Sequence, residues 1–177
     1  DRGFVEVDGG FKTSNPKIIA VGDVIGGAML AHKGSHEATV AIDIILGVKS
    51  KMKYGAVPGV IYTSPEVASV GASERDLKAK GIDVKTVKFP LAANSRDVAI
   101  GGNDPCFVKY LVCTKTNKLF GAGIIAPHAG ELIGEPTLAI AADLTLDQLA
   151  HTVHAHPTFL ESLHETAMGS ISDFYHM

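Results

Sequence analysis

The chain has 177 residues, of which 46% are hydrophobic and 20% charged, and its formal net charge is −3. A chain of this length and composition can bury the core of a globular domain. Its 16 Lys and Arg residues form no dense basic run, so a nucleic-acid-binding role loses support. No apolar run approaches the ~20 residues of a membrane-spanning helix, and the N-terminus lacks a signal-peptide pattern, so membrane and secretory roles lose support as well.

The first fifty residues have the pattern of the end of an α/β domain. Residues 17–21 (KIIAV) are a short apolar run that predicts a buried strand. Residues 31–46 have apolar positions at helical spacing, with Ser35 available as the cap and Gly47 as the stop. One strand and one helix cannot close a doubly wound sheet. Because the chain also begins without Met, we expect residues 1–50 to be the remnant of a domain whose start is absent.

Asp23 follows the predicted strand directly. A carboxylate just past the carboxyl end of a buried strand lies where open α/β sheets bind ligands, and it can accept hydrogen bonds from sugar or polyol hydroxyls. The alternative is that Asp23 only closes a turn before Gly26 and Gly27. The Gly-Asp dipeptide taken alone favours the turn.

Residues 48–59 contain three lysines, two glycines and a proline, a composition typical of a linker, and we place the domain boundary after residue 50. Beyond it, Ser73 is expected to cap a helix that ends at Gly81, and residues 90–105 are expected to form a loop. Short or alternating apolar runs predict strands at residues 60–63, 67–71, 82–89, 106–113 and 119–126.

The last third of the chain is predicted to be helical. One helix is expected over residues 131–144 with an interruption near Gly134 and Pro136, a second from the Thr145 capping box, and a third over residues 158–168. Strands followed by helices, without βαβ alternation, predict an α+β fold for residues 51–177: an antiparallel sheet with helices on one face.

The two cysteines, Cys106 and Cys113, have six residues between them on one apolar run. This spacing fits neither a CxxC motif nor a disulfide framework. We expect both to be reduced core thiols in a reducing compartment.

Residues 154–161 (HAHPTFLE) place an imidazole, His156, five residues before a carboxylate, Glu161. An imidazole titrates near neutrality, and a neighbouring carboxylate can hold the ring and stabilise its charged form, so the pair can serve as an acid–base dyad. The alternative is a capping box in which Thr158 caps a helix and Glu161 reaches back to the Thr158 N–H.

Two other groups carry weaker signals. His151, His154 and His156 are close in sequence, but they share no helical face and no acidic or Cys ligand converges on them, so no metal site is predicted. Gly121 and Gly123 lie within a predicted strand without GxGxxG spacing, and are expected to let another backbone come close.

Four motifs occur in one order and spacing: GDVIGGAMLAHK (residues 22–33), IYTSPEVASVG (61–71), FPLAANSR (89–96) and HAHPT (154–158). Together they closely resemble the dihydrolipoamide dehydrogenase family, which are class I flavoprotein pyridine nucleotide-disulfide oxidoreductases. The resemblance runs from about residue 17 to residue 161. It implies that residues 1–50 end an FAD-binding domain and that residues 51–177 form the interface, or dimerisation, domain of a homodimer.

The resemblance also implies site residues and partners. His156 matches the family's acid–base histidine and Glu161 its carboxylate partner, and both would act on the redox-active dithiol of the other subunit. The cofactors would be FAD and NAD⁺, and the protein partners would be lipoyl domains of 2-oxo acid dehydrogenase complexes or the glycine cleavage system. The location would be the cytoplasm in a bacterium or the mitochondrial matrix in a eukaryote. The residues that match the flavin-binding positions are Asp23, Met29, Leu30, Ala31 and His32.

The sequence departs from the family in several places. It has no glycine-rich nucleotide loops and no redox-active Cys pair, so we expect the chain alone to be inactive and to retain neither cofactor. Ser64 stands where a His is common, residues 34–37 (GSHE) replace an acidic run, and Leu160 replaces a small polar residue. The alternatives are an inactive stand-alone dimerisation module, or the same domain of a glutathione or mercuric reductase.

Overall fold

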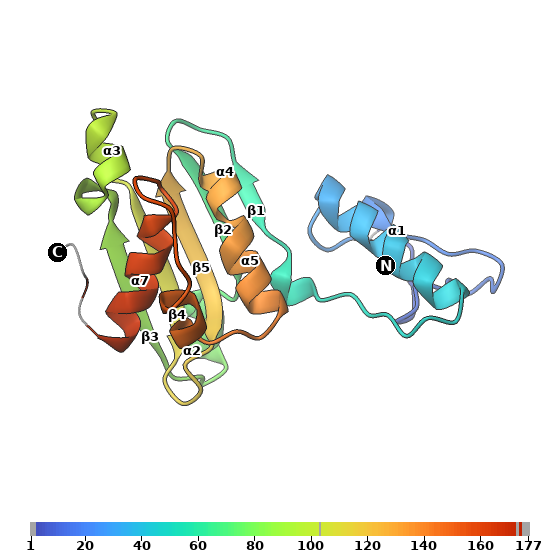
Figure 1. The fold of residues 1–177 in the computed structure, drawn as a ribbon. Coiled ribbons are helices and arrows are strands. Elements are labelled where there is room, and N and C mark those ends of the chain that lie inside the picture. Colours follow the sequence, from blue (N-terminus) through green and yellow to red (C-terminus); the bar gives the residue numbers. More distant parts are fainter. Residues whose placement is uncertain (1–2, 103, 173, 175–177) are drawn as a thin grey trace. The chain divides into compact units, whose positions relative to one another are not determined.

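The computed structural model describes residues 3–102, 104–172 and 174. Its contacts divide the chain into two compact units, Asp1–Tyr54 and Gly55–Met177, each with its own elements (Figure 1). The short 3₁₀ turn η2 (Tyr54–Ala56) lies at this division along the chain.

The N-terminal unit contains one long helix, α1 (Ala31–Ile45), preceded by the 3₁₀ turn η1 (Gly22–Ile25). The predicted helix is confirmed, but Ser35 is not its cap because the helix already begins at Ala31. Gly47 follows the end of the helix with a φ of 78°, a left-handed conformation that glycine adopts without strain.

The prediction of a strand at residues 17–21 is wrong. Ile19 makes only an isolated antiparallel bridge with Lys12, and Ile18 is 52% exposed. A strand needs neighbours that pair with its backbone groups, and the described residues of this unit offer this segment a single bridge. The apolar run therefore lacks the sheet in which it could be buried.

The C-terminal unit is built on a five-stranded sheet in the order β1-β2-β5-β4-β3, with every neighbouring pair antiparallel. All five predicted strands are present, with ends shifted by a few residues. The strands are β1 (Gly59–Ile61), β2 (Glu66–Gly71), β3 (Val84–Pro90), β4 (Phe107–Cys113) and β5 (Leu119–Ala126).

The end of β2 and the start of β5 approach too closely for side chains. A Cβ on Gly121 would lie 2.2 Å from the carbonyl oxygen of Ala72, and one on Gly71 would lie 2.4 Å from that of Phe120. The prediction that a second backbone comes close is therefore confirmed at Gly121. It is wrong at Gly123, where a Cβ would meet no atom within 4 Å.

Short helices follow and join the strands. Ser73 caps the first of them by accepting the N–H of Asp76, and Thr145 opens another through the predicted capping box. Both caps are as predicted. The helices and 3₁₀ turns are α2 (Glu74–Ala79), η3 (Leu91–Ala93), α3 (Ser95–Ala99), α4 (Ala129–Leu132), α5 (Gly134–Ala141), α6 (Leu146–Ala150) and α7 (Glu161–Ile171).

Two sequence expectations about these elements need correction. Residues 90–105 are not simply a loop, because they contain η3 and α3, which begins after Asn94. The last helix begins at Glu161 rather than at Thr158, and residues 158–160 form a bend and turn before it. The break predicted near Gly134 is present between α4 and α5, but Pro136 does not interrupt the helix, because it lies in the first turn of α5.

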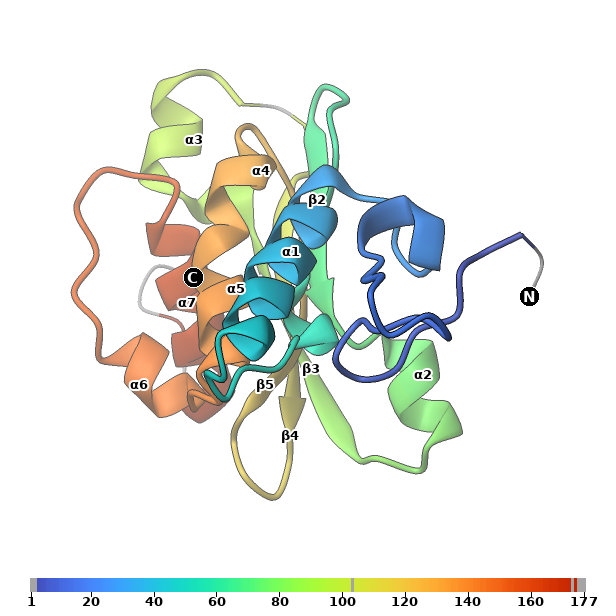
Figure 2. The ribbon, with the colours of Figure 1, turned by 90° about the vertical axis from the view of Figure 1, so that its right-hand side faces the viewer.

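Helices α4, α5 and α7 cover one face of the sheet (Figures 1 and 2). The core lies between them, where Leu163 and Ala167 of α7 meet buried side chains of β4 such as Val108 and Tyr110, all with no exposed surface. The predicted α+β class, an antiparallel sheet with helices on one face, is confirmed. Cys106, just before β4, and Cys113, its last residue, are free and buried.

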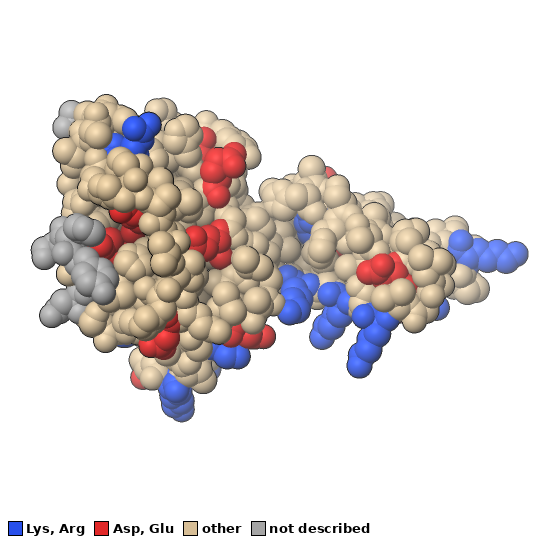
Figure 3. All heavy atoms as spheres, viewed as in Figure 1, with Lys and Arg blue, Asp and Glu red and all other residues tan. Residues whose placement is uncertain are grey.

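Charged side chains are dispersed over the surface of the C-terminal unit. On the face of this unit that Figure 3 draws, acidic residues form small separate groups and Lys and Arg side chains do not merge into one basic patch. Among the helices of the described ranges, none is both long and apolar enough to cross a membrane.

Candidate active site

His156 and Glu161 form a hydrogen-bonded pair at the start of α7. Nδ1 of His156 lies 2.8 Å from Oε1 of Glu161, and the imidazole is 64% exposed while the carboxylate is only 16% exposed. An ionised carboxylate only accepts hydrogen bonds, so beside an ionised Glu161 a neutral ring would carry its proton on Nδ1 and keep the lone pair on Nε2. The arrangement leaves Nε2 able to take a proton from a thiol, hydroxyl or water.

Glu161 contacts both of the groups that the sequence offered as its partners, but the predicted capping box is not formed, because α7 begins at Glu161 and its N-cap is Leu160 rather than Thr158. Its Oε1 holds His156, while its Oε2 accepts the N–H of Thr158 at 2.9 Å. The second bond is the reaching-back half of a capping box. The hydroxyl of Thr158 donates to the carbonyl oxygen of Ala155 at 2.7 Å. One carboxylate therefore orders the start of α7 and the ring together.

His154, two residues earlier, is engaged elsewhere. Its Nε2 lies 3.1 Å from both carboxylate oxygens of Glu135 on α5, its Nδ1 faces the carbonyl oxygen of Thr152 at 2.8 Å, and its side chain is 5% exposed. The ring also stacks at a tilt on His164 of α7, with centroids 5.4 Å apart. His154 is thus an anchor between the loop and two helices.

The three neighbouring histidines do not converge on one point. Nδ1 of His151 faces the carbonyl oxygen of Asp147 at 2.6 Å, while His154 and His156 are turned onto two different glutamates. In the part of the chain that the structure describes, no group of three or more His, Cys, Asp or Glu side chains is placed to hold a metal ion.

The predicted flavin-contacting residues lie together in the N-terminal unit. Asp23 belongs to η1 and is exposed, and its carbonyl oxygen accepts the N–H of Gly26 at 2.9 Å, so the turn that the sequence favoured is formed with the carboxylate left at the surface. Met29 is 60% exposed, and Ala31 and His32 are exposed in the first turn of α1. Leu30, half-buried, precedes that turn.

A buried network beneath these residues was missed from the sequence. The ammonium of Lys33 lies 3.1 Å from Glu37 and donates to the carbonyl oxygens of Gly22 at 3.3 Å and Gly26 at 2.9 Å, and both charged side chains are almost fully buried. Glu37 also accepts the N–H of Gly22 at 2.7 Å. The network therefore ties both ends of η1, which carries Asp23, to α1. The i,i+4 spacing of Lys33 and Glu37 is the sequence signal that could have indicated it.

Contacts within the network shift the pKa values of Glu37 and Tyr54. Burial raises the pKa of Glu37, but hydrogen bonds from Gly22, Tyr54 and Lys33 outweigh burial, and the net pKa lies below its ordinary value. Burial, together with the hydrogen bond to Glu37 at 2.8 Å and the charge of that residue, raises the pKa of Tyr54 to about 12. Glu37 is therefore ionised and Tyr54 neutral at physiological pH.

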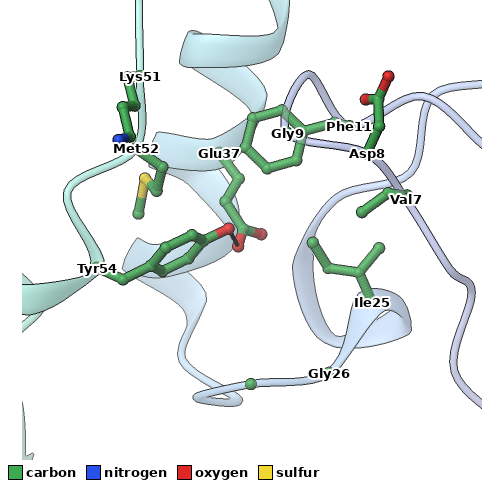
Figure 4. A pocket seen from close by; sticks show the side chains of 11 residues that line it. Val7, Asp8, Gly9, Phe11, Ile25, Gly26, Glu37, Lys51, Met52 and Tyr54 are labelled. Atoms are coloured by element: carbon green, nitrogen blue, oxygen red, sulfur yellow. Dashed lines mark hydrogen bonds between the residues drawn. The ribbon is translucent and has the colours of Figure 1, made fainter.

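A hollow of about 560 Å³ lies beside this network (Figure 4). The Tyr54 hydroxyl and the Glu37 carboxylate meet on one side of it, and Phe11, Met52 and Ile25 line other sides. The lining is mostly apolar, and the Glu37 charge is neutralised by Lys33 rather than presented to the hollow.

Comparison with known proteins gives a consistent result. Residues 57–167 match the family model described as pyridine nucleotide-disulphide oxidoreductase, dimerisation domain. A dihydrolipoyl dehydrogenase of Geobacillus stearothermophilus is 45% identical over 94% of this chain and 35% of its own length, and a mitochondrial dihydrolipoyl dehydrogenase of Arabidopsis thaliana is 43% identical over 99% of this chain and 34% of its own.

Solved structures agree with the sequence comparison. The chain is similar to LpdA from Mycobacterium tuberculosis, with a TM-score of 0.89, 28% identity and coverage of 96% of this chain and 37% of the other. It is also similar to the HOCl-induced flavoprotein disulfide reductase RclA from Escherichia coli, with a TM-score of 0.81, 27% identity and coverage of 92% and 38%.

This chain spans about a third of the length of the curated relatives that it matches. The matched family model covers well over half of the chain and contains both members of the histidine–glutamate pair. The chain therefore belongs to the pyridine nucleotide-disulphide oxidoreductases, whose dimerisation domain it carries.

Proposed function

We propose that this chain is the C-terminal part of a homodimeric dihydrolipoamide dehydrogenase and that His156 and Glu161 are its acid–base dyad. The observation that carries the proposal is the 2.8 Å bond from Nδ1 of a largely exposed imidazole to a largely buried carboxylate, which leaves Nε2 free to act as a base. The similarity to dihydrolipoyl dehydrogenases over nearly the whole chain supports the substrate class.

The dyad fits the proton chemistry of dithiol oxidation. A thiolate, not a thiol, attacks a disulfide, so the reaction needs a base at the thiol. Nε2 of His156 takes the proton from one S–H group of dihydrolipoamide, and the resulting thiolate attacks one sulfur of the redox-active disulfide, whose S–S bond breaks to release the other sulfur as a thiolate. Glu161 stabilises the imidazolium that forms and keeps the ring oriented. That disulfide would belong to the other subunit of the dimer.

We also assign part of an FAD site to the N-terminal unit. The exposed carboxylate of Asp23 can accept hydrogen bonds from ribityl hydroxyls, and exposed Met29, Ala31 and His32 with half-buried Leu30 offer a mixed apolar surface at the start of α1. When bound, FAD would accept the electrons of the dithiol and pass them to NAD⁺. No residue of this chain is assigned to NAD⁺.

The proposed partners follow from the substrate. They are a second copy of the same chain and the lipoyl domains of 2-oxo acid dehydrogenase complexes or of the glycine cleavage system. The proposed location is the cytoplasm if the source is bacterial and the mitochondrial matrix if it is eukaryotic, in line with bacterial and mitochondrial relatives.

The proposal is tested in a full-length reductase that carries this segment. We expect His156→Gln to lower turnover of dihydrolipoamide by a factor on the order of 10² or more, because the base is lost, while the flavin absorbance stays unchanged. The matched control is His151→Gln, since that ring is exposed and bonded only to the carbonyl oxygen of Asp147 among the described residues. Turnover of His156→Gln equal to that of the control would overturn the proposal.

A second candidate function, an interface module without turnover, is favoured by apolar side chains at the surface of the C-terminal unit. Tyr62 is 82% exposed, Leu138 63% and Val153 96%. Both functions require self-association, so self-association alone does not distinguish them. A 177-residue chain that is produced as such in its source, self-associates and shows no bound flavin absorbance would support the second function.

A further inference from the structure

We infer that Asn94 is a positioning residue for the His156–Glu161 dyad. The inference deepens the proposed function and depends on it. It begins from a contact between two segments of the C-terminal unit that are 64 residues apart in the sequence: Nδ2 of Asn94 donates to the carbonyl oxygen of Thr158 at 3.1 Å.

Asn94 is itself held firmly. Its side chain is buried, with 3% of the residue exposed, and its Oδ1 accepts the N–H groups of Arg96 and Asp97, each at 3.1 Å. Oδ1 thus caps α3, and the planar amide then directs Nδ2 away from that helix. An amide anchored through its oxygen in this way presents its N–H at a defined place.

The bond reaches the dyad through one residue. The N–H of Thr158 donates to Oε2 of Glu161 at 2.9 Å, and Oε1 of the same carboxylate holds Nδ1 of His156 at 2.8 Å. The N–H and C=O of Thr158 lie on either side of its Cα, so anchoring both of them restricts the two free backbone dihedrals of that residue. Asn94 therefore fixes the direction in which the Thr158 N–H holds the carboxylate.

Substitutions at Asn94 can remove the bond to Thr158 while keeping the cap of α3. Asp and Ser cap helices about as well as Asn, so Asn94→Asp and Asn94→Ser retain the acceptor for α3. Neither retains the amide N–H that donates to Thr158: the Ser side chain ends one bond short of the Nδ2 position, and Asp brings a carboxylate oxygen against the carbonyl oxygen. Ser95→Ala is the matched control, because Ser95 is the exposed neighbour in α3.

In the full-length reductase we expect Asn94→Ser and Asn94→Asp to lower kcat for dihydrolipoamide on the order of 10-fold, since displacing a catalytic group by about 1 Å can cost up to about 10². KM should change by less than about twofold, because Asn94 is not proposed to touch the substrate. Ser95→Ala should match the wild type in both constants.

A second readout does not depend on turnover. The ¹⁵N spectrum of neutral His156 should show a protonated Nδ1 in the wild type and in Ser95→Ala, and a mixture of tautomers in both Asn94 variants. If the two Asn94 variants match Ser95→Ala in kcat and in tautomer while His156→Gln is inactive, the proposed function stands and the role of Asn94 is overturned. If His156→Gln instead turned over dihydrolipoamide as fast as the wild type, the proposed function itself would be overturned.

Discussion

Glu161 links helix formation to the orientation of the His156 ring. Its two carboxylate oxygens are divided between the Thr158 N–H and Nδ1 of His156. A carboxylate in the first turn of a helix is favoured by the free N–H groups and by the dipole of that helix. The carboxylate proposed to stabilise the imidazolium is therefore held by the fold rather than by the ring alone.

At the same scale, Tyr54 supplies a test of the buried network in the N-terminal unit. Absorbance titration should show this phenol ionising near pH 12 instead of its ordinary pKa of 10. Because the folded pKa is raised, the stability that Tyr54 contributes is complete below pH 10 and is lost as the pH rises through about 12. Tyr54→Phe should remove this step from the titration. If Tyr54→Phe instead removed a step near pH 10, that result would contradict the network.

The site could be predicted only where its residues are close in sequence. The spacing of His156 and Glu161 indicated a dyad, and their contact has the geometry that a dyad needs. Lys33 and Glu37 had the spacing of a helical ion pair, but nothing in the sequence showed that η1 would bury it. Asn94 could not be connected with the dyad, because a contact across 64 residues depends on how the chain folds.

At the scale of elements, the loop between α6 and α7 is anchored on both sides of His156. His154 bonds to Glu135 of α5, and Thr158 bonds to Asn94. Both anchors are buried or nearly so, whereas the ring between them is largely exposed. An irregular segment can thus hold an exposed side chain in one orientation without being a helix or a strand.

The first anchor gives a stability prediction. Glu135→Gln removes the charge that faces Nε2 of nearly buried His154, and we expect the free energy of unfolding to fall by about 1–3 kcal/mol in denaturant titration. Glu131→Gln on α4 is the matched control, because Glu131 is exposed and should change stability by less than about 0.5 kcal/mol. Equal effects of the two substitutions would show that the His154 contact does not stabilise the fold.

The sequence predicted the elements of the C-terminal unit better than those of the N-terminal unit. Alternation and capping signals are local, and the five strands, Ser73 and Thr145 were found from them. The prediction of a strand at residues 17–21 failed because a strand depends on neighbouring strands to pair with, and the described residues of this unit do not supply them. Helix α3 was missed because five residues are too few to show a helical period.

At the scale of the whole molecule, each unit carries one part of the proposed chemistry. The unit Gly55–Met177 carries the sheet, the dyad and the exposed apolar residues Leu138 and Val153, while the unit Asp1–Tyr54 carries η1 with Asp23 on its buried network. The matched family model is a dimerisation domain, and it covers the sheet and most of α7.

Self-association is the prediction that belongs to this scale. Sedimentation equilibrium of the 177-residue chain should give a dimer, because a domain that forms an interface of the usual size, about 1,600 Å², exposes apolar side chains when alone. Replacing Leu138 and Val153 together by Ser should shift the equilibrium toward the monomer. A wild-type chain that remains monomeric at high concentration would contradict the assignment of an interface.

The most direct test of the central claim is the tautomer of neutral His156, measured from the ¹⁵N shifts of its two ring nitrogens and assigned by comparison with His156→Gln. Glu161 accepts from Nδ1, so we predict that Nδ1 is the protonated nitrogen and Nε2 the free base, and that Glu161→Ala abolishes this preference. A ring protonated at Nε2 in the wild type would contradict the claim, since the nitrogen proposed to receive the thiol proton would already carry one.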